Sequence, residues 1–411
     1  MSAPFSIAVT GQSLIRHDLR AISDPRLAEI AEILKASDIA FTNLETTIYG
    51  RHGGWPLKGS YFGAATPEVL PALKELGFNS LALANNHAFD LGPPGILSTL
   101  EEVAAHNFLH AGIGHNKHHA STAQKMTFGS RSVALIAMDA GPGPSFMYAE
   151  NASQDRIARP GINRLKVSRV FDLETGTFNL LRSIQEHLLS SPLERANYAQ
   201  PEDPPNLNGQ DEIDFYGTVF RRSDETARRI VVDRHSARAH LSAIAEEAGR
   251  DTFVIVYLHH HHWEPNWQQV PAWVREFAHD CVNAGAGLFV SHGAPVLQAA
   301  EIYRNTPIFY GLGNFLFHTE RDEQEWSPPE VWRSVIATCN FGSSGRLESI
   351  HLRPIVIGGT EALSNPDRDR LPFPVLADGG MAADILDDLA DRSAGFGTVL
   401  EREKNVGQIA L

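Results

Sequence analysis

Cysteine, long apolar runs and a leader-like N-terminus are all missing or scarce in this chain. Only Cys281 and Cys339 occur among its 411 residues, which excludes a disulfide framework and a cysteine-rich zinc site. No stretch approaches the roughly 20 apolar residues of a spanning helix. The first residues lack the basic segment and apolar core of a secretory signal. These absences predict a cytoplasmic protein with reduced thiols and no membrane partner.

Positive charge is also scarce. The chain has 35 Lys and Arg against 49 Asp and Glu, a formal net charge of −14 with neutral histidines. Nucleic acid and anionic membranes are bound through basic surfaces, so neither is an expected partner. A hydrophobic content of 43% and a charged content of 20% are those of an ordinary globular protein with a large core.

Strand-like and helix-like patterns alternate along most of the chain. Apolar stretches typical of buried strands lie at residues 5–11, 38–45, 79–87, 132–140, 254–258, 287–292, 306–315 and 351–359. Helical spacing marks residues 24–37, 66–77, 95–107, 271–285 and 381–394. This alternation predicts an α/β fold with a mainly parallel sheet covered by helices.

The pattern becomes longer and more polar at about residues 172–249. Within it, residues 201–215 are rich in Pro, Asn and Asp and are typical of an exposed loop or lid. We therefore expect one domain over residues 1–340 that carries this insertion. A strand-and-helix extension over residues 341–411 is expected to pack on the same domain.

Four consecutive histidines occupy residues 259–262, directly after the apolar run 254–258. Side chains alternate in an extended segment, so His259 and His261 are expected on one face and His260 and His262 on the other. Neutral imidazole is the commonest metal ligand and a proton shuttle near pH 7. A solvated loop is the alternative interpretation. The position at a strand end favours a metal or catalytic role, because ligands of open α/β sheets collect there.

Other predicted strands also end in polar residues. These residues are Gln12; Asn43 and Glu45; Asn86, His87 and Asp90; and His292. Any one of these clusters taken alone is more typical of turn chemistry or of a structural histidine. Together, carboxylate, amide and imidazole groups on one edge predict a site for one or two divalent transition metal ions, with Mn, Zn, Fe and Co as candidates.

Five segments carry a resemblance to a known family. They are FTNLETTI (41–48), ALANNHAFDLG (82–92), AGIGHN (111–116), SHGAPVLQAAEIY (291–303) and IFYGLGNFLFH (308–318). Their order and spacing resemble the motif series of the CapA family, the bacterial capsule-synthesis or poly-γ-glutamate-associated proteins. The resemblance implies a calcineurin-like metallophosphoesterase fold, a four-layer α/β/β/α sandwich with two mixed sheets. It also implies a metal-supported site at the strand ends.

The resemblance further implies roles for individual residues. Glu45 stands where metallophosphoesterases keep a bridging aspartate, and Asn86 and His87 match an Asn-His pair of ligand and proton donor. Asn314 matches the structural asparagine of a Gly-Asn-Phe turn. The implied metal ligands are Glu45, Asn86, His259, His261 and His292.

Three positions depart from the family pattern. The usual aspartate after the first strand is Gln12, and two histidines of a His-His-Pro-His stretch are replaced by Gly293 and Pro295. An amide cannot replace the charge of a carboxylate on a metal. The sequence therefore predicts one well-held metal or a rearranged site, and weak or no two-metal phosphoesterase activity.

The leading functional hypothesis is a metal-dependent hydrolase that acts on an amide or ester bond of a small anionic or polyglutamate-like substrate. His87 would be the general acid or base, with Asp90 as its orienting carboxylate. Predicted substrate contacts are Gln12, Asn43, His260, His262 and Arg159, which lies beside a Pro-Gly turn; an ordinary surface turn is the alternative for Arg159. Lys58 is interpreted either as an anion anchor or as a merely exposed residue.

Two other functions stay open. The same metal could stabilise an enolate while a histidine removes a proton, as in a lyase or dehydratase. The chain could instead be a non-catalytic accessory protein for making an anionic polymer such as capsule or poly-γ-glutamate. The sequence is also compatible with a homo-oligomer.

Overall fold

The computed structural model describes residues 3–58, 63–188, 209–215, 217–250, 252–319, 326–364 and 371–411. These residues form two compact units. Unit 1 comprises Met1–Pro142, Met147–Arg164 and His240–Leu411, and unit 2 comprises Gly143–Phe146 and Leu165–Ala239. In the described part of the chain no helix is both long and apolar enough to cross a membrane.

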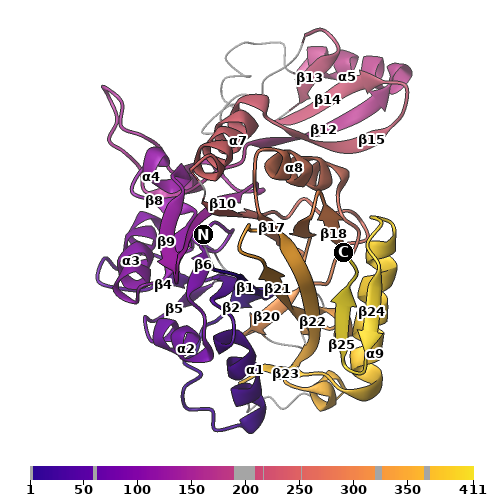
Figure 1. Ribbon diagram of the computed structural model, residues 1–411. Helices are drawn as coiled ribbons and strands as arrows, with labels where there is room; N and C mark the ends of the chain where they lie inside the picture. The colour runs from indigo at the N-terminus through magenta and orange to yellow at the C-terminus, as the bar shows by residue number, and fades with distance from the viewer. Residues whose placement is uncertain are drawn as a thin grey trace. The chain divides into compact units, whose positions relative to one another are not determined.

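The first sheet of unit 1 has nine strands in the order β24-β25-β22-β21-β1-β3-β6-β7, with β23 beside β22 (Figure 1). Its parallel part consists of β1 (Phe5–Val9), β3 (Ile39–Asn43), β6 (Ser80–Ala82) and β7 (Leu109–Ala111). Its antiparallel part consists of β21 (Arg333–Phe341), β22 (Leu347–Ile357), β23 (Pro374–Leu376), β24 (Leu400–Glu403) and β25 (Val406–Ile409). The expectation of a mainly parallel sheet is therefore wrong for this half.

The second sheet of unit 1 has six strands in the order β18-β19-β17-β16-β10-β9. Four of them are parallel: β10 (Arg131–Asp139), β16 (Phe253–His259), β17 (Leu288–His292) and β19 (Thr306–Phe309). The edge strands β9 (Gln124–Phe128) and β18 (Ala300–Tyr303) are antiparallel. The strand predicted over 306–315 is in fact two, because β20 (Asn314–Phe317) pairs with β2 (Gln12–Leu14) instead.

The two sheets pack face to face through apolar and aromatic side chains. The ring centroids of Phe41 and Tyr257 are 5.8 Å apart, and those of Phe5 and Phe253 are 4.9 Å apart. One continuous buried cluster contains residues from both sheets and from the helices α1 (Pro25–Lys35), α2 (Val69–Leu76), α3 (Gly92–Ala105) and α9 (Gly379–Ala394). Removal of this apolar surface from water is the main stabilising contribution. α9 runs beside the C-terminal strands, and α8 (Ala272–Asn283) contacts β17 (Figure 1). The predicted α/β/β/α sandwich with two mixed sheets is confirmed.

Short elements complete unit 1. Two-residue strands pair as β4 (Thr47–Ile48) with β5 (Ala64–Ala65), and as β8 (Ile113–Gly114) with β11 (Gly161–Ile162), close to the short helix α4 (Lys117–Ser121). At the start of helix α1 the Asp24 side chain caps the helix by accepting the Arg26 N–H, and Pro25 takes the first helical position.

Unit 2 is built on a four-stranded sheet in the order β13-β14-β12-β15. Its strands are β12 (Val167–Glu174), β13 (Glu212–Phe215), β14 (Thr218–Ser223) and β15 (Ala227–Val232), joined by helix α5 (Thr175–Leu188). Helix α7 (Arg234–Ala248) begins in unit 2 and ends in unit 1. Part of the stretch expected to be a loop is thus strand β13, whereas residues 201–208 of it lie outside the described residues. A lid role for the insertion stays a prediction.

Candidate metal centre

Glu45 stands at the carboxyl end of the first sheet. It follows β3, the strand between β1 and β6, and its backbone N–H donates to the carbonyl of Ser13 at 3.0 Å. Its side chain is buried, with 3% of the residue surface exposed. This anchoring holds a carboxylate at the point where the two sheets meet.

Two histidines from the second sheet meet this carboxylate. Ligand atoms of Glu45, His259 and His261 all lie within 4.8 Å of one another. His259 Nε2 is 3.6 Å from Glu45 Oε1 and 3.0 Å from the side-chain oxygen of Asn86, which follows β6. The residues after β3, after β6 and at the end of β16 thus supply a carboxylate, an amide oxygen and two imidazoles at one place.

The donor atoms of this group fit a divalent cation. Glu45 Oε2 and His261 Nε2 are buried without a hydrogen-bond partner among the described residues. An unpaired buried carboxylate is costly unless it meets a cation. Burial raises the pKa of Glu45 to about 8, with Lys58 opposing and Asp90 and Asp139 adding to the shift.

The two imidazoles are ready ligands at neutral pH. Burial lowers the pKa of His259 well below its usual range and that of His261 to about 3, and neighbouring basic groups, other histidines and for His261 also Lys58, add to the shift. Both rings are therefore neutral, the state in which imidazole binds a metal. A carboxylate, an amide oxygen and neutral imidazoles form a donor set that suits Mn, Fe, Co or Zn.

Metal-free protein is expected to lose stability between pH 6.5 and 8. The pKa of Glu45 is 4.5 as a free side chain and about 8 in the fold, so the folded state binds more protons over this range. The free energy of unfolding then falls by up to about 1.4 kcal/mol per pH unit as the pH rises. Histidines whose pKa is lower in the fold than in the unfolded chain make a constant contribution to the free energy of unfolding above about pH 6.5. They therefore do not change the slope over this range. Urea unfolding of chelator-treated protein measures the slope, and a Glu45→Gln variant that keeps it would refute the assignment.

His87 and Asp90 form a buried pair beside this group. His87 Nδ1 is 2.7 Å from Asp90 Oδ2, and Lys58 Nζ is 3.1 Å from Asp90 Oδ1. Burial lowers the pKa of His87, and its bond to Asp90 opposes that shift. With Nδ1–H donated to Asp90, the tautomer assigned from this network, Nε2 is left for a reacting group. The pair adjoins the metal ligands, because Asn86, the residue before His87, contacts His259, and Lys58 bonds both Asn86 and Asp90.

Gly63, the residue before β5, lies close against this pair. The N–H of Gly63 donates to Asp90 Oδ2 at 2.7 Å. A Cβ atom at residue 63 would lie 2.8 Å from His87 Nδ1, so only glycine lets the backbone approach the imidazole this closely. Lys58 also donates to the carbonyl of Asn86 at 2.5 Å. The structure thus places Lys58 at the site, and its side chain keeps 31% of its surface exposed.

Asp139 is a site residue that the sequence interpretation missed. It ends β10 in register with His259, is 1% exposed, and accepts the Tyr148 hydroxyl at 2.9 Å and the Gly141 N–H at 3.1 Å on Oδ2. Its Oδ1 has no hydrogen-bond partner among the described residues. Burial raises the pKa of Asp139 to about 6. An aspartate at the end of the apolar stretch 132–140 was the signal that could have revealed it.

Three predicted residues lie at the strand ends but outside the Glu45 group. His292 pairs in register with His259, yet does not join the group, and both its ring nitrogens lack partners in the described structure. Gln12 donates its amide to Asn314 at 3.0 Å, which leaves Gln12 Oε1 unpaired among the described residues. Asn43 accepts from Asn85 at 3.0 Å. Their roles as ligand or substrate contacts stay predictions.

His260 and His262 pack on the opposite face of their segment. Their ring centroids lie 5.1 Å and 6.2 Å from that of Trp273 on α8, and His262 Nε2 is 3.1 Å from the carbonyl of Ala140. Residue 293 has to be glycine because it lies against the backbone of His260. A Cβ atom there would lie 1.8 Å from the His260 carbonyl oxygen. A histidine at position 293 is thus excluded in this backbone. Substrate binding by His260 and His262 stays a prediction.

Arg159 is tied to a neighbouring segment of unit 1. Its Nε donates to the carbonyl of Tyr148 at 3.0 Å, and its backbone exchanges two 3.0 Å hydrogen bonds with Glu150. These contacts fix the backbone of the turn. A contact with substrate stays a prediction.

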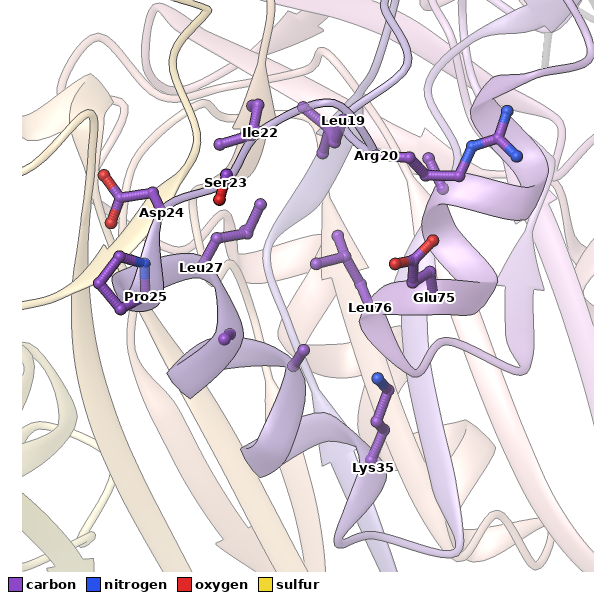
Figure 2. A pocket seen from close by; sticks show the side chains of 13 residues that line it. Leu19, Arg20, Ile22, Ser23, Asp24, Pro25, Leu27, Lys35, Glu75 and Leu76 are labelled. Atoms are coloured by element: carbon purple, nitrogen blue, oxygen red, sulfur yellow. The ribbon is translucent and has the colours of Figure 1, made fainter.

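A surface pocket of about 450 Å³ lies elsewhere in unit 1, between α1, α2 and the segment before α1 (Figure 2). Leu19, Leu27 and Leu76 line it, and Arg20 and Glu75 are among its charged groups (Figure 2). It contains no histidine and none of the residues predicted for the site. Its ionisable residues are Arg20, Asp24, Lys35 and Glu75. None of them offers a buried, unpartnered ligand atom like those of Glu45 and His261, so the Glu45 group is the better candidate.

Fold and side chains together define a two-sheet α/β protein with a candidate metal centre at the carboxyl ends of its strands. The chain belongs to the family described as Bacterial capsule synthesis protein PGA_cap, whose profile matches residues 6–319. The family membership that the motifs implied is thereby confirmed.

Individual relatives are distant. An uncharacterized protein, y4sH, of Sinorhizobium fredii is 28% identical over 450 aligned residues, which cover 99% of this chain and 93% of that protein. A probable polyglutamine synthesis accessory protein of Mycobacterium tuberculosis is 23% identical over 322 residues, covering 78% and 66%. A 5'-nucleotidase precursor from Thermus thermophilus superposes with a TM-score of 0.35 at 11% identity, covering 86% of this chain and 54% of that one. A similarity this weak does not establish a shared fold.

Proposed function

We propose that the protein is a metal-dependent hydrolase that cleaves an amide or ester bond of a small anionic or polyglutamate-like substrate. One observation carries the proposal: the Glu45–His259–His261 group, with Asn86, lies beside the His87–Asp90 pair. A cation site next to a buried acid–base pair combines the Lewis acid and the proton carrier with which a metal-dependent hydrolase cleaves an acyl bond.

The side chains have distinct roles in this proposal. Glu45, Asn86, His259 and His261 would hold one divalent transition metal, which when bound would supply a Lewis acid for a carbonyl and for water. His87 accepts a proton through Nε2 as water adds to the carbonyl carbon. It then returns the proton to the leaving nitrogen or oxygen as that bond breaks. Asp90 holds the Nδ1–H of His87 and stabilises the imidazolium that forms.

The charge distribution supports an anionic substrate. Lys58 is partly exposed, and its ammonium group forms an ion pair with Asp90 at the edge of the site. At this position the ammonium group can attract a carboxylate of the substrate. The family description names capsule synthesis, and one relative is named for polyglutamine synthesis. Polyglutamine itself carries no side-chain carboxylate, whereas a γ-linked glutamate chain combines an amide bond with free carboxylates and matches both the proposed acyl chemistry and the charge of Lys58. The two free cysteines, Cys281 and Cys339, are both buried, and the cytoplasm stays the predicted compartment.

The direct test is turnover of a defined oligomer. Purified protein loaded with Mn²⁺, Zn²⁺ or Co²⁺ is incubated with synthetic γ-linked pentaglutamate and with a glutamyl ester, and the release of free amine or alcohol is followed. We expect release that chelator abolishes and that Glu45→Gln lacks. Stoichiometric metal without release from either substrate would overturn the hydrolase and leave a binding protein.

A non-catalytic accessory function is the second candidate. The word accessory in the name of the Mycobacterium tuberculosis relative favours it, and so does the uncharged Gln12 in place of an aspartate. Equilibrium dialysis against the same pentaglutamate separates the two functions, because an accessory protein binds the oligomer and returns it uncut.

Gln12 is expected to limit the centre to one metal. The variant Gln12→Asp introduces the carboxylate that the family pattern has after β1. Residue 12 precedes Ser13, which pairs with Leu44 and accepts the Glu45 N–H. We expect the metal content of the saturated protein to rise from one to two ions per chain, and phosphodiesterase activity on bis(p-nitrophenyl) phosphate in Mn²⁺ to appear. Gln12→Asn is the matched uncharged control. One ion per chain in all three proteins would show that Gln12 does not set the number.

A further inference from the structure

Tyr257 is a buried residue to which the proposed chemistry gives no role. It lies on β16 two positions before His259, so both side chains point to the same face of the sheet. No part of Tyr257 is exposed. Its ring contacts Phe41 of the first sheet and His292 of the next strand, at centroid distances of 5.8 Å and 5.7 Å.

The hydroxyl of this tyrosine reaches His259. The phenol oxygen is 3.3 Å from His259 Nδ1, its one hydrogen bond within the described part of the chain. Burial, with the nearby carboxylates of Glu45 and Asp139, raises the pKa of Tyr257 well above its ordinary value. The group is therefore a neutral phenol, which can both donate and accept a hydrogen bond.

This bond determines which nitrogen of His259 faces the metal site. With Nδ1 held by the phenol, Nε2 points at the Asn86 oxygen, 3.0 Å away, and toward Glu45 Oε1, 3.6 Å away. Ligand histidines generally use their second nitrogen in this way, and the outer partner fixes the orientation of the ring. We propose that Tyr257 is the positioning residue of the metal centre, holding the His259 imidazole with Nε2 directed at the cation site. The inference rests on the proposed metal centre.

A phenol suits this position better than the usual carboxylate partner. Glu45 lies 3.6 Å from the His259 ring and Asp139 pairs in register with His259, so two buried acidic residues already lie near this histidine, and a third would repel both. The phenol adds no charge. It can donate to Nδ1 when Nε2 carries the proton, and accept from Nδ1–H when Nε2 binds a cation, so one hydroxyl serves the metal-free and the metal-bound protein.

The experiment is Tyr257→Phe, which removes only the hydroxyl. Affinity for Zn²⁺ and Mn²⁺ is measured by competition with a chromophoric chelator, and the Co²⁺-loaded protein is examined by visible absorption. We expect affinity about 10- to 100-fold weaker and a changed Co²⁺ spectrum, while one ion still binds at saturation. Tyr310→Phe is the matched control, since its buried hydroxyl bonds Glu301 instead of a metal ligand. It should leave affinity and spectrum unchanged.

The outcomes separate the two levels of the proposal. A wild-type protein that binds no metal overturns the metal centre itself. A wild-type protein that binds metal, with Tyr257→Phe equal to it in affinity and spectrum, overturns only the positioning role. Equal losses in Tyr257→Phe and Tyr310→Phe would also overturn it, because the effect would then be general destabilisation.

Discussion

Replacing His259 or His261 with glutamine will remove the bound metal, whereas the same replacement at His260 or His262 will leave it in place. The first two rings share the Glu45 face of the segment, and the second two pack against Trp273. Loss of a direct ligand should exceed the 10- to 100-fold typical of an outer partner, so we expect affinity to fall by more than about 100-fold.

The four glutamine variants control one another because they lie in one run of four residues. Metal content after dialysis, measured by inductively coupled plasma mass spectrometry, gives the result, and circular dichroism confirms that each variant is folded. Metal retained in the His259 and His261 variants, or lost equally from all four, would contradict the assignment of faces.

His87→Gln is expected to lower kcat by about 10²- to 10⁴-fold, the range for removal of a general acid or base, and to leave the metal bound. Asp90 lies 2.7 Å from His87 Nδ1, whereas the contact with His259 is made by Asn86, the residue before His87. The substitution at His87 therefore removes the acid–base group and leaves the metal ligands in place. Asp90→Asn should cost less, because the imidazole itself remains.

Steady-state rates on the pentaglutamate substrate, with metal content measured on the same samples, test this prediction. His240→Gln is the control, since that buried histidine bonds the carbonyl of Arg164 and has no acidic partner within the described part of the chain. Full activity of His87→Gln with metal bound would exclude His87 from the chemistry.

Much of the architecture follows from local patterning. Alternating apolar strands and amphipathic helices indicated an α/β fold, and polar residues at strand ends indicated one functional edge. The structure brings Glu45, His259 and His261 within 4.8 Å. The two-residue period of a strand gave the division of the four histidines between two faces, because it depends on backbone geometry alone.

Other features depend on pairings between distant segments. Strand β21, at residues 333–341, was not recognised, although it pairs with β1 in the middle of the first sheet. Lys58 reaches Asp90 from a loop, and Asp139 meets the site because β10 and β16 are in register. His292 was expected among the ligands, yet its position depends on how β17 lies beside β16. Composition and spacing do not encode such long-range contacts.

The measurement closest to the central claim is anomalous diffraction from crystals of the metal-loaded protein, collected on both sides of the absorption edge of the metal. We predict one anomalous peak per chain, within coordination distance of Glu45, Asn86, His259 and His261. A peak at other residues, or no peak from protein shown to be saturated with metal, would contradict the claim.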